Sequence, residues 1–551
     1  MKPTHLILSL SVLLFGSCST KPQADLLLYN AVVYTVDDAF SVHDAIAVSD
    51  GKVVAVGAKA DLEQSFAMDS TLDLNGAIVF PGFIDAHCHV MGYAQALLTA
   101  DLRAAVSEKE MVFLLKRWYD LQVERGLTLD RVQGWGWDQN NWPGKEMPER
   151  SLLDSLFPDV PVILRRVDGH AVLVNGKALE TDEVCCPDRL EGGEIVMDGD
   201  RPTGLLIDNA VERVEDWTPD KAQRKDALKL AEQNLLAHGL TGLHDAGLPK
   251  EEWMLLRSMS ANGDFRIPIS CMASDDPENF AFLRESGPIE EDRFWLRSVK
   301  FYSDGALGSR GALLLEPYAD APHAHGLPVT SREDMKERLE EVYEMGLQAC
   351  VHAIGDSANR MVLKLYADRL QDDRSRRWRV EHAQVVQPDD RHWFSDHGII
   401  PSVQPTHATS DADWAEDRLG AGRMEAAYAY SSLRAQLGIL PLGTDFPVED
   451  IDPLKTFYSA VSRKDFSGMP ESGFLTSESL SREEAIRGMT VEAAYAQFRE
   501  TETGSLEAGK WADLVVLDTD LMKCAEVAIP TARILSTWIR GERLYSAQDS
   551  N

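Results

Sequence analysis

The sequence is short of basic residues, of cysteine and of long apolar runs. Its 551 residues include 55 Lys and Arg against 89 Asp and Glu, which gives a formal net charge of −34. A surface this acidic repels a phosphate backbone, so the composition argues against nucleic acid as a partner. Beyond the N-terminal segment no run of about 18 uninterrupted apolar residues occurs, and no membrane-spanning helix is expected.

Cysteine is scarce, with 7 in the chain, and the spacing gives neither a CxxC pair nor a zinc-finger pattern. Several cysteines lie in apolar, strand-like runs, so buried free thiols are expected rather than a disulfide framework. The neighbours Cys185 and Cys186 are poorly placed for ordinary disulfide geometry. With 44% hydrophobic and 26% charged residues, the composition is that of folded globular domains.

The first residues have the pattern of an export signal. Lys2 precedes an apolar run over 6–15, and Gly16 and Ser17 stand directly before Cys18. This resembles a bacterial lipobox, with 1–17 as signal peptide, Cys18 as the lipidated residue and 18–24 as a tether. We therefore expect a lipid-anchored protein of the bacterial cell envelope, on the periplasmic side of the outer membrane. The alternative is a cleaved secretory signal that releases the protein into the periplasm.

Short alternating apolar runs with turn residues between them occupy both ends of the chain. Between Ala24 and Val79 they predict antiparallel strands, with a hairpin at Asp50-Gly51. The same pattern returns at 511–518 and 534–546. We expect residues 25–80 and 495–546 to form one small composite β-sandwich domain.

Between these ends, apolar strands alternate with amphipathic helices, as in parallel βα units. Eight strand candidates are present, and eight strands close a (β/α)8 TIM barrel. We assign this α/β barrel to residues 81–494, with 93–235 as an insertion after the first strand. The candidates are 83–89, 240–246, 267–273, 298–304, 348–354, 378–383, 399–405 and 440–445.

Histidines cluster at the end of the first barrel strand. His87 and His89 stand two residues apart, so both rings point to the same face of the strand and can hold a divalent metal. A second such pair, His323 and His325, lies in a loop-like stretch and is expected to be solvated or structural. Other metal-type side chains stand near the carboxyl ends of four more strands, and these ends share one rim of a barrel. They are Lys300, His352, His382 and Asp445.

Several motifs resemble the metal-dependent amidohydrolase superfamily: PGFIDAHCH, HAIGDSA, EHAQ, GTDFPVE and GSLEAGKWADLVVLD. Three more, SVKFYSDGALGSRGA, GWGWD and VDGHAVLVNGKAL, resemble its N-substituted formamide deformylase-like branch (amidohydrolase family 3). The resemblance extends from about Leu26 to Arg543. It implies a binuclear centre, usually of two Zn²⁺ ions. His87, His89 and Asp445 would hold one ion, His352 and His382 the other, and Lys300 would bridge them after carbamylation to N-carboxylysine.

Catalytic roles follow from this implied site, in which a hydroxide held by the metal ions attacks the substrate carbonyl. Asp445 would accept the proton of the attacking water and return it to the departing nitrogen. Lys300 and His382 are the other residues assigned to catalysis.

Further residues are candidates for substrate contact or support. Trp137 and His170 resemble cavity-lining positions, as do Trp135 and Asp138; core packing is the alternative for the aromatic rings and capping for Asp138. His407 follows the seventh strand on a rim loop and is also a candidate substrate contact. Two aspartates complete the set: Asp304, as a substrate-side residue that shapes its loop, and Asp85, as a partner that orients His87.

These features predict a hydrolase of a non-peptide carbon–nitrogen amide bond, such as that of an N-substituted formamide or an N-acyl amine. The same site could instead act on cyclic amides, esters or imines. A third possibility is an envelope lipoprotein that binds a ligand without catalysis. The expected partner is a small-molecule amide, with membrane contact only through the lipid anchor, and the sequence leaves a homo-oligomer open.

Overall fold

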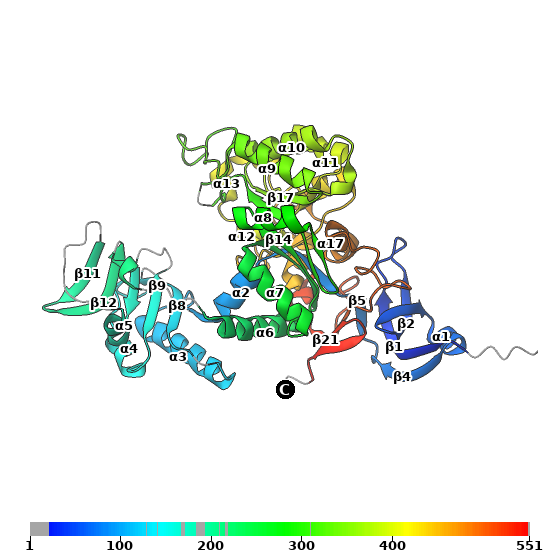
Figure 1. Ribbon diagram of the computed structural model, residues 1–551, viewed down its shortest axis with the longest axis horizontal. Helices are drawn as coiled ribbons and strands as arrows, with labels where there is room; N and C mark the ends of the chain where they lie inside the picture. Colours follow the sequence, from blue (N-terminus) through cyan, green and yellow to red (C-terminus); the bar gives the residue numbers. More distant parts are fainter. Residues whose placement is uncertain are drawn as a thin grey trace, which may run out of the picture.

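A parallel sheet that nearly closes on itself forms the centre of the molecule (Figure 1). The computed structural model describes residues 21–548 except 128, 140, 141, 167–170, 183, 185–192, 209, 215–218 and 309. The TIM-barrel prediction is confirmed, because every neighbouring pair of barrel strands is parallel. The two-residue strand β15 (Ile289–Glu290), outside this order, pairs antiparallel with one of them. In pairing order the strands are β19 (Ile400–Ser402), β18 (Arg379–His382), β17 (Gln348–Ala353), β16 (Phe294–Tyr302), β14 (Ile269–Ser274), β13 (Leu240–Leu248) and β6 (Phe83–Cys88).

The eighth predicted strand, 440–445, is reduced to a single bridge. Leu442 pairs with Val403, and its carbonyl accepts a hydrogen bond from the Ala86 amide at 3.1 Å, so the segment closes the barrel between β19 and β6. Gly443 passes so near β6 that a Cβ there would lie 2.5 Å from the His87 nitrogen. Asp445 then turns into the left-handed region with φ of 65°. The close approach and the turn end the strand before a ladder forms.

Helices cover the outside of the barrel (Figure 1). Helix α6 (Lys221–Ala237) begins with a capping box of Asp220 and Gln223, and it buries Leu228, Ala231 and Leu235, which share one helix face. No helix in the described part of the chain is long and apolar enough to cross a bilayer. Other helices of this layer are α7 (Lys250–Asn262), α8 (Pro277–Ser286), α9 (Arg332–Glu344), α10 (Asp356–Leu370), α11 (His392–His397), α14 (Tyr430–Leu437), α16 (Arg482–Gly488) and α17 (Val491–Ala496).

Strands from both chain ends join in one hydrogen-bonded sheet beside the barrel (Figure 1). The predicted hairpin is confirmed: Ser49 pairs with Lys52 across Asp50 and Gly51, which both have positive φ. The prediction of antiparallel pairing throughout is wrong. Strands β4 and β5 run parallel to β1, because helix α1 (Lys59–Ser65) returns the chain before β4. The strands are β1 (Gln23–Tyr34), β2 (Val42–Ser49), β3 (Lys52–Gly57), β4 (Ala67–Asp73), β5 (Ile78–Pro81), β20 (Leu514–Leu517), β21 (Ile534–Ile539) and β22 (Glu542–Ser546).

The stretch between β6 and β13 forms a second sheet with its own apolar core, to one side of the barrel (Figure 1). Helix α3 (Glu108–Glu124) packs on it through Met111 and Leu115. None of the sheet's described residues lines the cavity at the metal centre described below. Its strands are β7 (Thr99–Asp101), β8 (Val132–Trp137), β9 (Val162–Arg166), β10 (Ala171–Val174), β11 (Gly193–Asp198) and β12 (Arg201–Asp208), with helices α4 (Ser151–Leu156) and α5 (Gly176–Thr181).

Candidate metal centre

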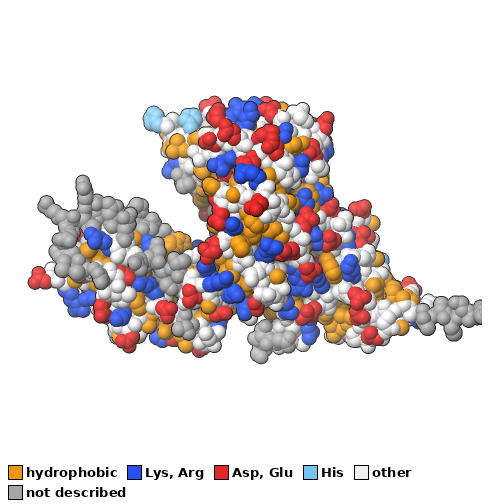
Figure 2. Space-filling model, viewed as in Figure 1, with side chains coloured by type: hydrophobic (Ala, Val, Ile, Leu, Met, Phe, Trp, Pro, Cys, Tyr) orange, Lys and Arg blue, Asp and Glu red, His pale blue; other side chains and the backbone are white. Residues whose placement is uncertain are grey.

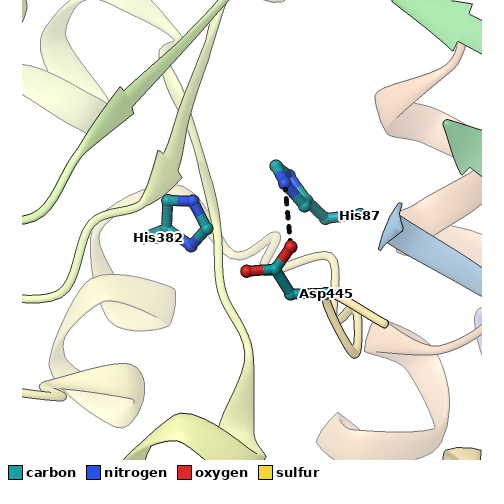
Figure 3. A group of neighbouring side chains, drawn as sticks. All are labelled: His87, His382 and Asp445. Atoms are coloured by element: carbon teal, nitrogen blue, oxygen red, sulfur yellow. Dashed lines mark ion pairs between the residues drawn. The ribbon is translucent and has the colours of Figure 1, made fainter. Parts of the chain in front are cut away.

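Three side chains from distant parts of the sequence converge at the carboxyl rim of the barrel (Figure 3). His87 lies on β6, His382 ends β18, and Asp445 follows the closing segment. One ligand atom from each lies within 4.8 Å of the other two. Such a group of two imidazoles and a carboxylate is a candidate site for a divalent metal.

The other predicted ligands surround this group. The Nε2 atom of His89 lies 3.0 Å from Asp445 Oδ1, and the ring of His352 lies 4.5 Å from that of His382. Lys300 is 1% exposed and lines the same cavity. All six predicted residues therefore lie in one region. The closest three include His87 and Asp445, which the resemblance assigns to one ion, and His382, which it assigns to the other.

Hydrogen bonds hold one nitrogen of three histidine rings away from the centre. The Nδ1 atoms of His87, His89 and His382 lie 2.6 Å from Glu381 Oε2, 2.9 Å from the Ala246 carbonyl and 2.8 Å from Gln404 Oε1, respectively. Because these partners are oxygen acceptors, each Nδ1 carries a proton. This leaves the Nε2 lone pairs of His87 and His382 free, whereas His89 Nε2 donates to Asp445 Oδ1, 3.0 Å away. The Nε2 atom of His87 is buried and has no hydrogen-bond partner among the described residues, as expected for an atom that coordinates a metal ion.

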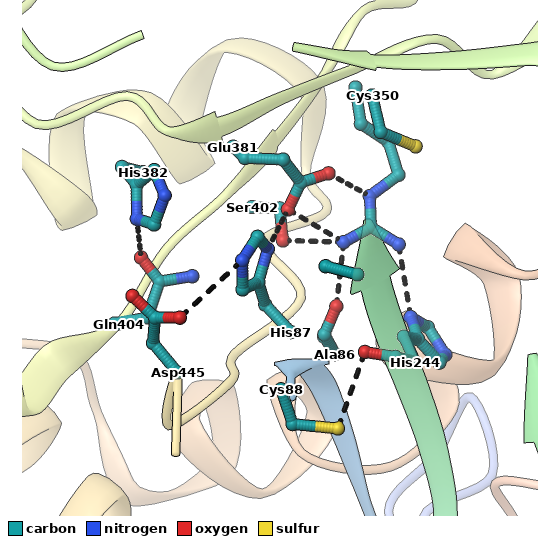
Figure 4. A network of polar contacts seen from close by, with 12 residues as sticks. Ala86, His87, Cys88, His244, Cys350, Glu381, His382, Ser402, Gln404 and Asp445 are labelled. Carbon is teal, nitrogen blue, oxygen red and sulfur yellow. Dashed lines mark hydrogen bonds and ion pairs between the residues drawn. The ribbon is translucent and has the colours of Figure 1, made fainter. Parts of the chain in front are cut away.

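Buried charges lie directly behind His87 (Figure 4). The Oε2 atom of Glu381 contacts His87 Nδ1. Both carboxylate oxygens of Glu381 also contact Arg379, with Oε2 2.9 Å from Nη2 and Oε1 2.7 Å from Nε. The Arg379 guanidinium also donates to the Ala86 carbonyl, to Ser402 Oγ and to His244 Nδ1. Arg379 therefore links β6, β13, β18 and β19, and it holds the carboxylate that holds His87.

Burial sets the protonation of the site. It lowers the pKa of His87 to about 4 and that of His352 to about 3, so both rings are neutral at pH 7. Burial acts to raise the pKa of Asp445, but the hydrogen bond from His89 holds that pKa well below its ordinary value. Neutral imidazoles and an ionised carboxylate are the forms that coordinate a divalent cation, so the donor set fits a metal ion.

Two of these residues have unusual backbone geometry. His382 has φ of 70° and Asp445 has φ of 65°, in the left-handed region that residues with a side chain rarely adopt. Strain of this kind is concentrated at functional sites, where the surrounding structure enforces it.

A cavity of about 380 Å³ opens from the centre. His407, at the start of helix α12 (Pro405–Ser410), lines it, and its Nε2 atom lies 3.6 Å from Asp445 Oδ2. His407 thus lines the cavity beside Asp445, and its contact with substrate stays a prediction. The remaining lining residues are His89, Lys300, Tyr302, Ala306, Leu307, Gly308, His352, Ile354, His382, Gln384, Asp411, Trp414, Asp445, Val448 and Glu449.

The prediction that Trp137 contacts substrate is wrong. Trp137 is 0% exposed in the core of the second sheet, packs against Trp142 and donates a hydrogen bond to the Leu164 carbonyl. Trp135 is 40% exposed on the same sheet, and Asp138 pairs with Arg166. The aromatic residues of GWGWD are therefore not part of the cavity lining.

We expect Trp137→Phe to weaken the second sheet without changing catalysis. Phe keeps most of the apolar volume but removes the hydrogen bond from the indole N–H to the Leu164 carbonyl, which costs about 0.5–1.5 kcal/mol. Chemical denaturation should show this loss of stability, while kcat/KM stays at the wild-type value. A raised KM with unchanged stability would instead show that Trp137 contacts the substrate.

The structure also corrects the roles predicted for Asp304 and Asp85. Asp304 is no substrate contact: it is 1% exposed and accepts the amides of Leu313, Ile354 and Gly355, so it shapes its loop as expected. Burial raises its pKa to about 6. Asp85 does not touch the His87 ring. Its oxygens accept the His87 amide and the Thr444 amide and hydroxyl, which tie β6 to the closing segment.

Other predicted residues lie apart from the centre or outside the described residues. His170 and Cys18, with the N-terminal signal and Cys185 and Cys186, fall outside them. His323 and His325 are exposed, as expected. The cysteines that the structure describes are free thiols, in agreement with the sequence. On the face shown in Figure 2, basic side chains are interspersed with acidic ones.

A parallel barrel that carries histidines and a carboxylate at its carboxyl rim defines a metal-dependent hydrolase. The family model for the amidohydrolase family matches residues 70–545, and the chain belongs to this family. It is accordingly a hydrolase of carbon–nitrogen bonds, as predicted.

Individual relatives agree over nearly the whole length. The chain is 32% identical to the protein LONG AFTER FAR-RED 3 of Arabidopsis thaliana, over 95% of this chain and 92% of that protein. It is 27% identical to N-substituted formamide deformylase of Arthrobacter pascens, over 96% and 99%. A solved structure of an uncharacterized metal-dependent hydrolase from Pyrococcus horikoshii superimposes with a TM-score of 0.74 at 26% identity, covering 91% of this chain and 99% of that one.

Proposed function

We propose that the protein hydrolyses a linear, non-peptide amide, such as an N-substituted formamide or an N-acyl amine. The observation that carries this proposal is the group of His87, His382 and Asp445, whose ligand atoms lie within 4.8 Å of one another beside an open cavity. The similarity to N-substituted formamide deformylase supports this substrate class. Cyclic amides, esters and imines are the alternative substrates of the same site.

The protein groups have separate tasks in this reaction. The histidines, Asp445 and Lys300 would hold a divalent metal, which we propose to be Zn²⁺ and which would supply a Lewis acid and a water of lowered pKa. Asp445 accepts the proton of the attacking water and returns it to the leaving nitrogen, because an amine departs poorly as an anion. His407, 3.6 Å from Asp445 Oδ2, stands beside this proton path.

Lys300 completes the proposed centre. It is 1% exposed and lines the cavity with the histidines. An unmodified ammonium would repel a bound cation, whereas a carbamate formed with CO₂ supplies an anionic oxygen ligand. We include this modification, and lipid anchoring through Cys18 in the cell envelope, in the proposal.

Removal and return of metal tests this function. Treatment with a chelator should remove about two equivalents of zinc and abolish hydrolysis of N-formyl and N-acyl amines, and added Zn²⁺ should restore both. Hydantoins and aryl esters in the same panel test the alternative substrates. Activity that survives complete metal removal would contradict the proposed function.

A further inference from the structure

The cavity beyond the metal centre has an unbalanced charge. Apart from the six predicted ligands and His407, its charged side chains are Asp411 and Glu449. Lys300, itself a predicted ligand, is the one Lys or Arg among the described lining residues. A substrate carboxylate would meet two like charges here, and an unpaired buried charge is costly.

The carboxylate of Asp411 is held in a fixed orientation by its neighbours. Its Oδ2 atom accepts hydrogen bonds from the Tyr428 hydroxyl at 2.7 Å and from Gln384 Nε2 at 3.1 Å. Among the described residues no hydrogen bond reaches Oδ1. One oxygen of Asp411 is therefore left for a ligand.

Glu449 offers a similar arrangement from the loop after Asp445. Its Oε1 atom accepts the Ser410 hydroxyl at 2.6 Å, and the described residues donate nothing to Oε2. Ser410 and Asp411 are adjacent in the chain, so the two carboxylates belong to one wall of the cavity. Charge-assisted hydrogen bonds from a cation to such oxygens are the strong kind.

An aromatic ring accompanies this acidic wall. Trp414 lines the cavity and lies against Gly308, where a Cβ would be only 3.2 Å from the ring. Tyr302, 41% exposed, and the buried Leu307 add apolar surface. A chain of methylene groups can pack on this surface. The Arg418 guanidinium already lies over the Trp414 ring, 5.7 Å from its centroid, so Trp414 counts here as apolar surface.

We propose that this wall selects amides whose amine part ends in a second, protonated amine, and that it rejects N-acyl amino acids. The inference rests on the proposed amide hydrolysis and names its substrate class: a diamine acylated on one nitrogen. Hydrolysis adds water across the C–N bond and gives a carboxylic acid and the free diamine. Asp411 and Glu449 bind the distal ammonium and are residues that determine specificity.

Three formamides of closely matched length test the selection: N-formyl-1,6-diaminohexane, N-formylheptylamine and N-formyl-6-aminohexanoate. With zinc-loaded protein, kcat/KM should fall in that order, by about 100-fold or more between the cationic and the anionic compound, because both carboxylates contribute.

Asp411→Asn and Glu449→Gln should each reduce the ratio of kcat/KM for the cationic compound to that for the anionic compound by about tenfold. Glu449→Lys should favour the anionic compound. Asp413→Asn, an exposed aspartate in the same loop and outside the cavity lining, is the matched control and should leave the ratio unchanged.

Binding of the three compounds, measured by calorimetry, distinguishes failure of the proposed substrate selection from failure of the proposed amide hydrolysis. If the affinities follow the predicted order and none of the compounds is hydrolysed, the selection stands and the proposed function fails. Equal affinities and equal kcat/KM values, or a preference for the anion in the wild-type protein, would overturn the selection. A ratio that persists in Asp411→Asn and in Glu449→Gln would overturn the assignment to these residues.

Discussion

Asp445→Asn should lower kcat by about 10²–10⁴-fold, the usual contribution of a positioned acid–base group. The amide cannot accept the proton of the attacking water, and it is a weaker metal ligand than a carboxylate. Asp445 lies within reach of four histidines, since His89, His87 and His407 are 3.0–3.6 Å away and His382 belongs to the closest trio. Steady-state kinetics with metal analysis of the same sample measures both effects.

The overall fold should survive this substitution. Asn has nearly the shape of Asp, so the closing segment can keep its backbone hydrogen bond from the Asp445 amide to the His87 carbonyl, 2.8 Å long. Circular dichroism and the melting temperature should therefore stay close to those of the wild type. Asp450→Asn, an aspartate of the same loop that pairs with Lys455, is the control and should retain activity. An Asp445→Asn variant with near-normal turnover would refute the role of Asp445.

Strand-end positions could be read from the sequence because barrel geometry is regular. His87, Lys300 and His352 each lie on a barrel strand, and the parallel pairing brings their strand ends to one rim even where the register shifts. Asp445 was found by its place after the last apolar run, although that run forms only a bridge. The pattern of strands therefore predicts which residues meet, even where one strand is irregular.

The residues that support the centre could not be found in this way. In a regular strand Glu381 and His382 would point to opposite faces. The positive φ of His382 breaks this alternation, so both side chains face the interior of the barrel. Nothing in the local sequence predicts this loss of side-chain alternation, so Glu381 is missing from the predicted site.

The error at Trp137 has a different cause. Tryptophans near glycines suggest a ligand-binding loop. In β8, however, the pairing register shifts between Trp135 and Trp137, and Gly136 between them has φ of 96°, so Trp137 is buried in the core while Trp135 stays 40% exposed. Sequence alone cannot tell whether a sheet inserted into a barrel closes over the rim or lies beside it. That choice depends on packing between distant elements.

Glu381→Gln should disturb both the fold and the metal centre, and a second substitution separates the two effects. The single variant leaves Arg379, 1% exposed, without its charged partner, which costs about 3–5 kcal/mol. Replacing both as Glu381→Gln/Arg379→Met removes the unpaired charge and should recover most of the stability. His87 still lacks the carboxylate that fixes its Nδ1 proton, so metal affinity should remain about 10–100-fold weaker.

Urea denaturation of the metal-free protein and Co²⁺ titration followed by visible absorption measure these two quantities independently. Ser402→Ala is the matched control, because it removes one contact of Arg379 at 2.9 Å and leaves the pair of Glu381 and His87 intact. Its Co²⁺ spectrum and affinity should equal those of the wild type. Glu381→Asp keeps the charge but withdraws it by one methylene, so it should fold with Arg379 still paired and bind Co²⁺ weakly. Wild-type affinity in both the double variant and Glu381→Asp would mean that the carboxylate stabilises the barrel without positioning His87.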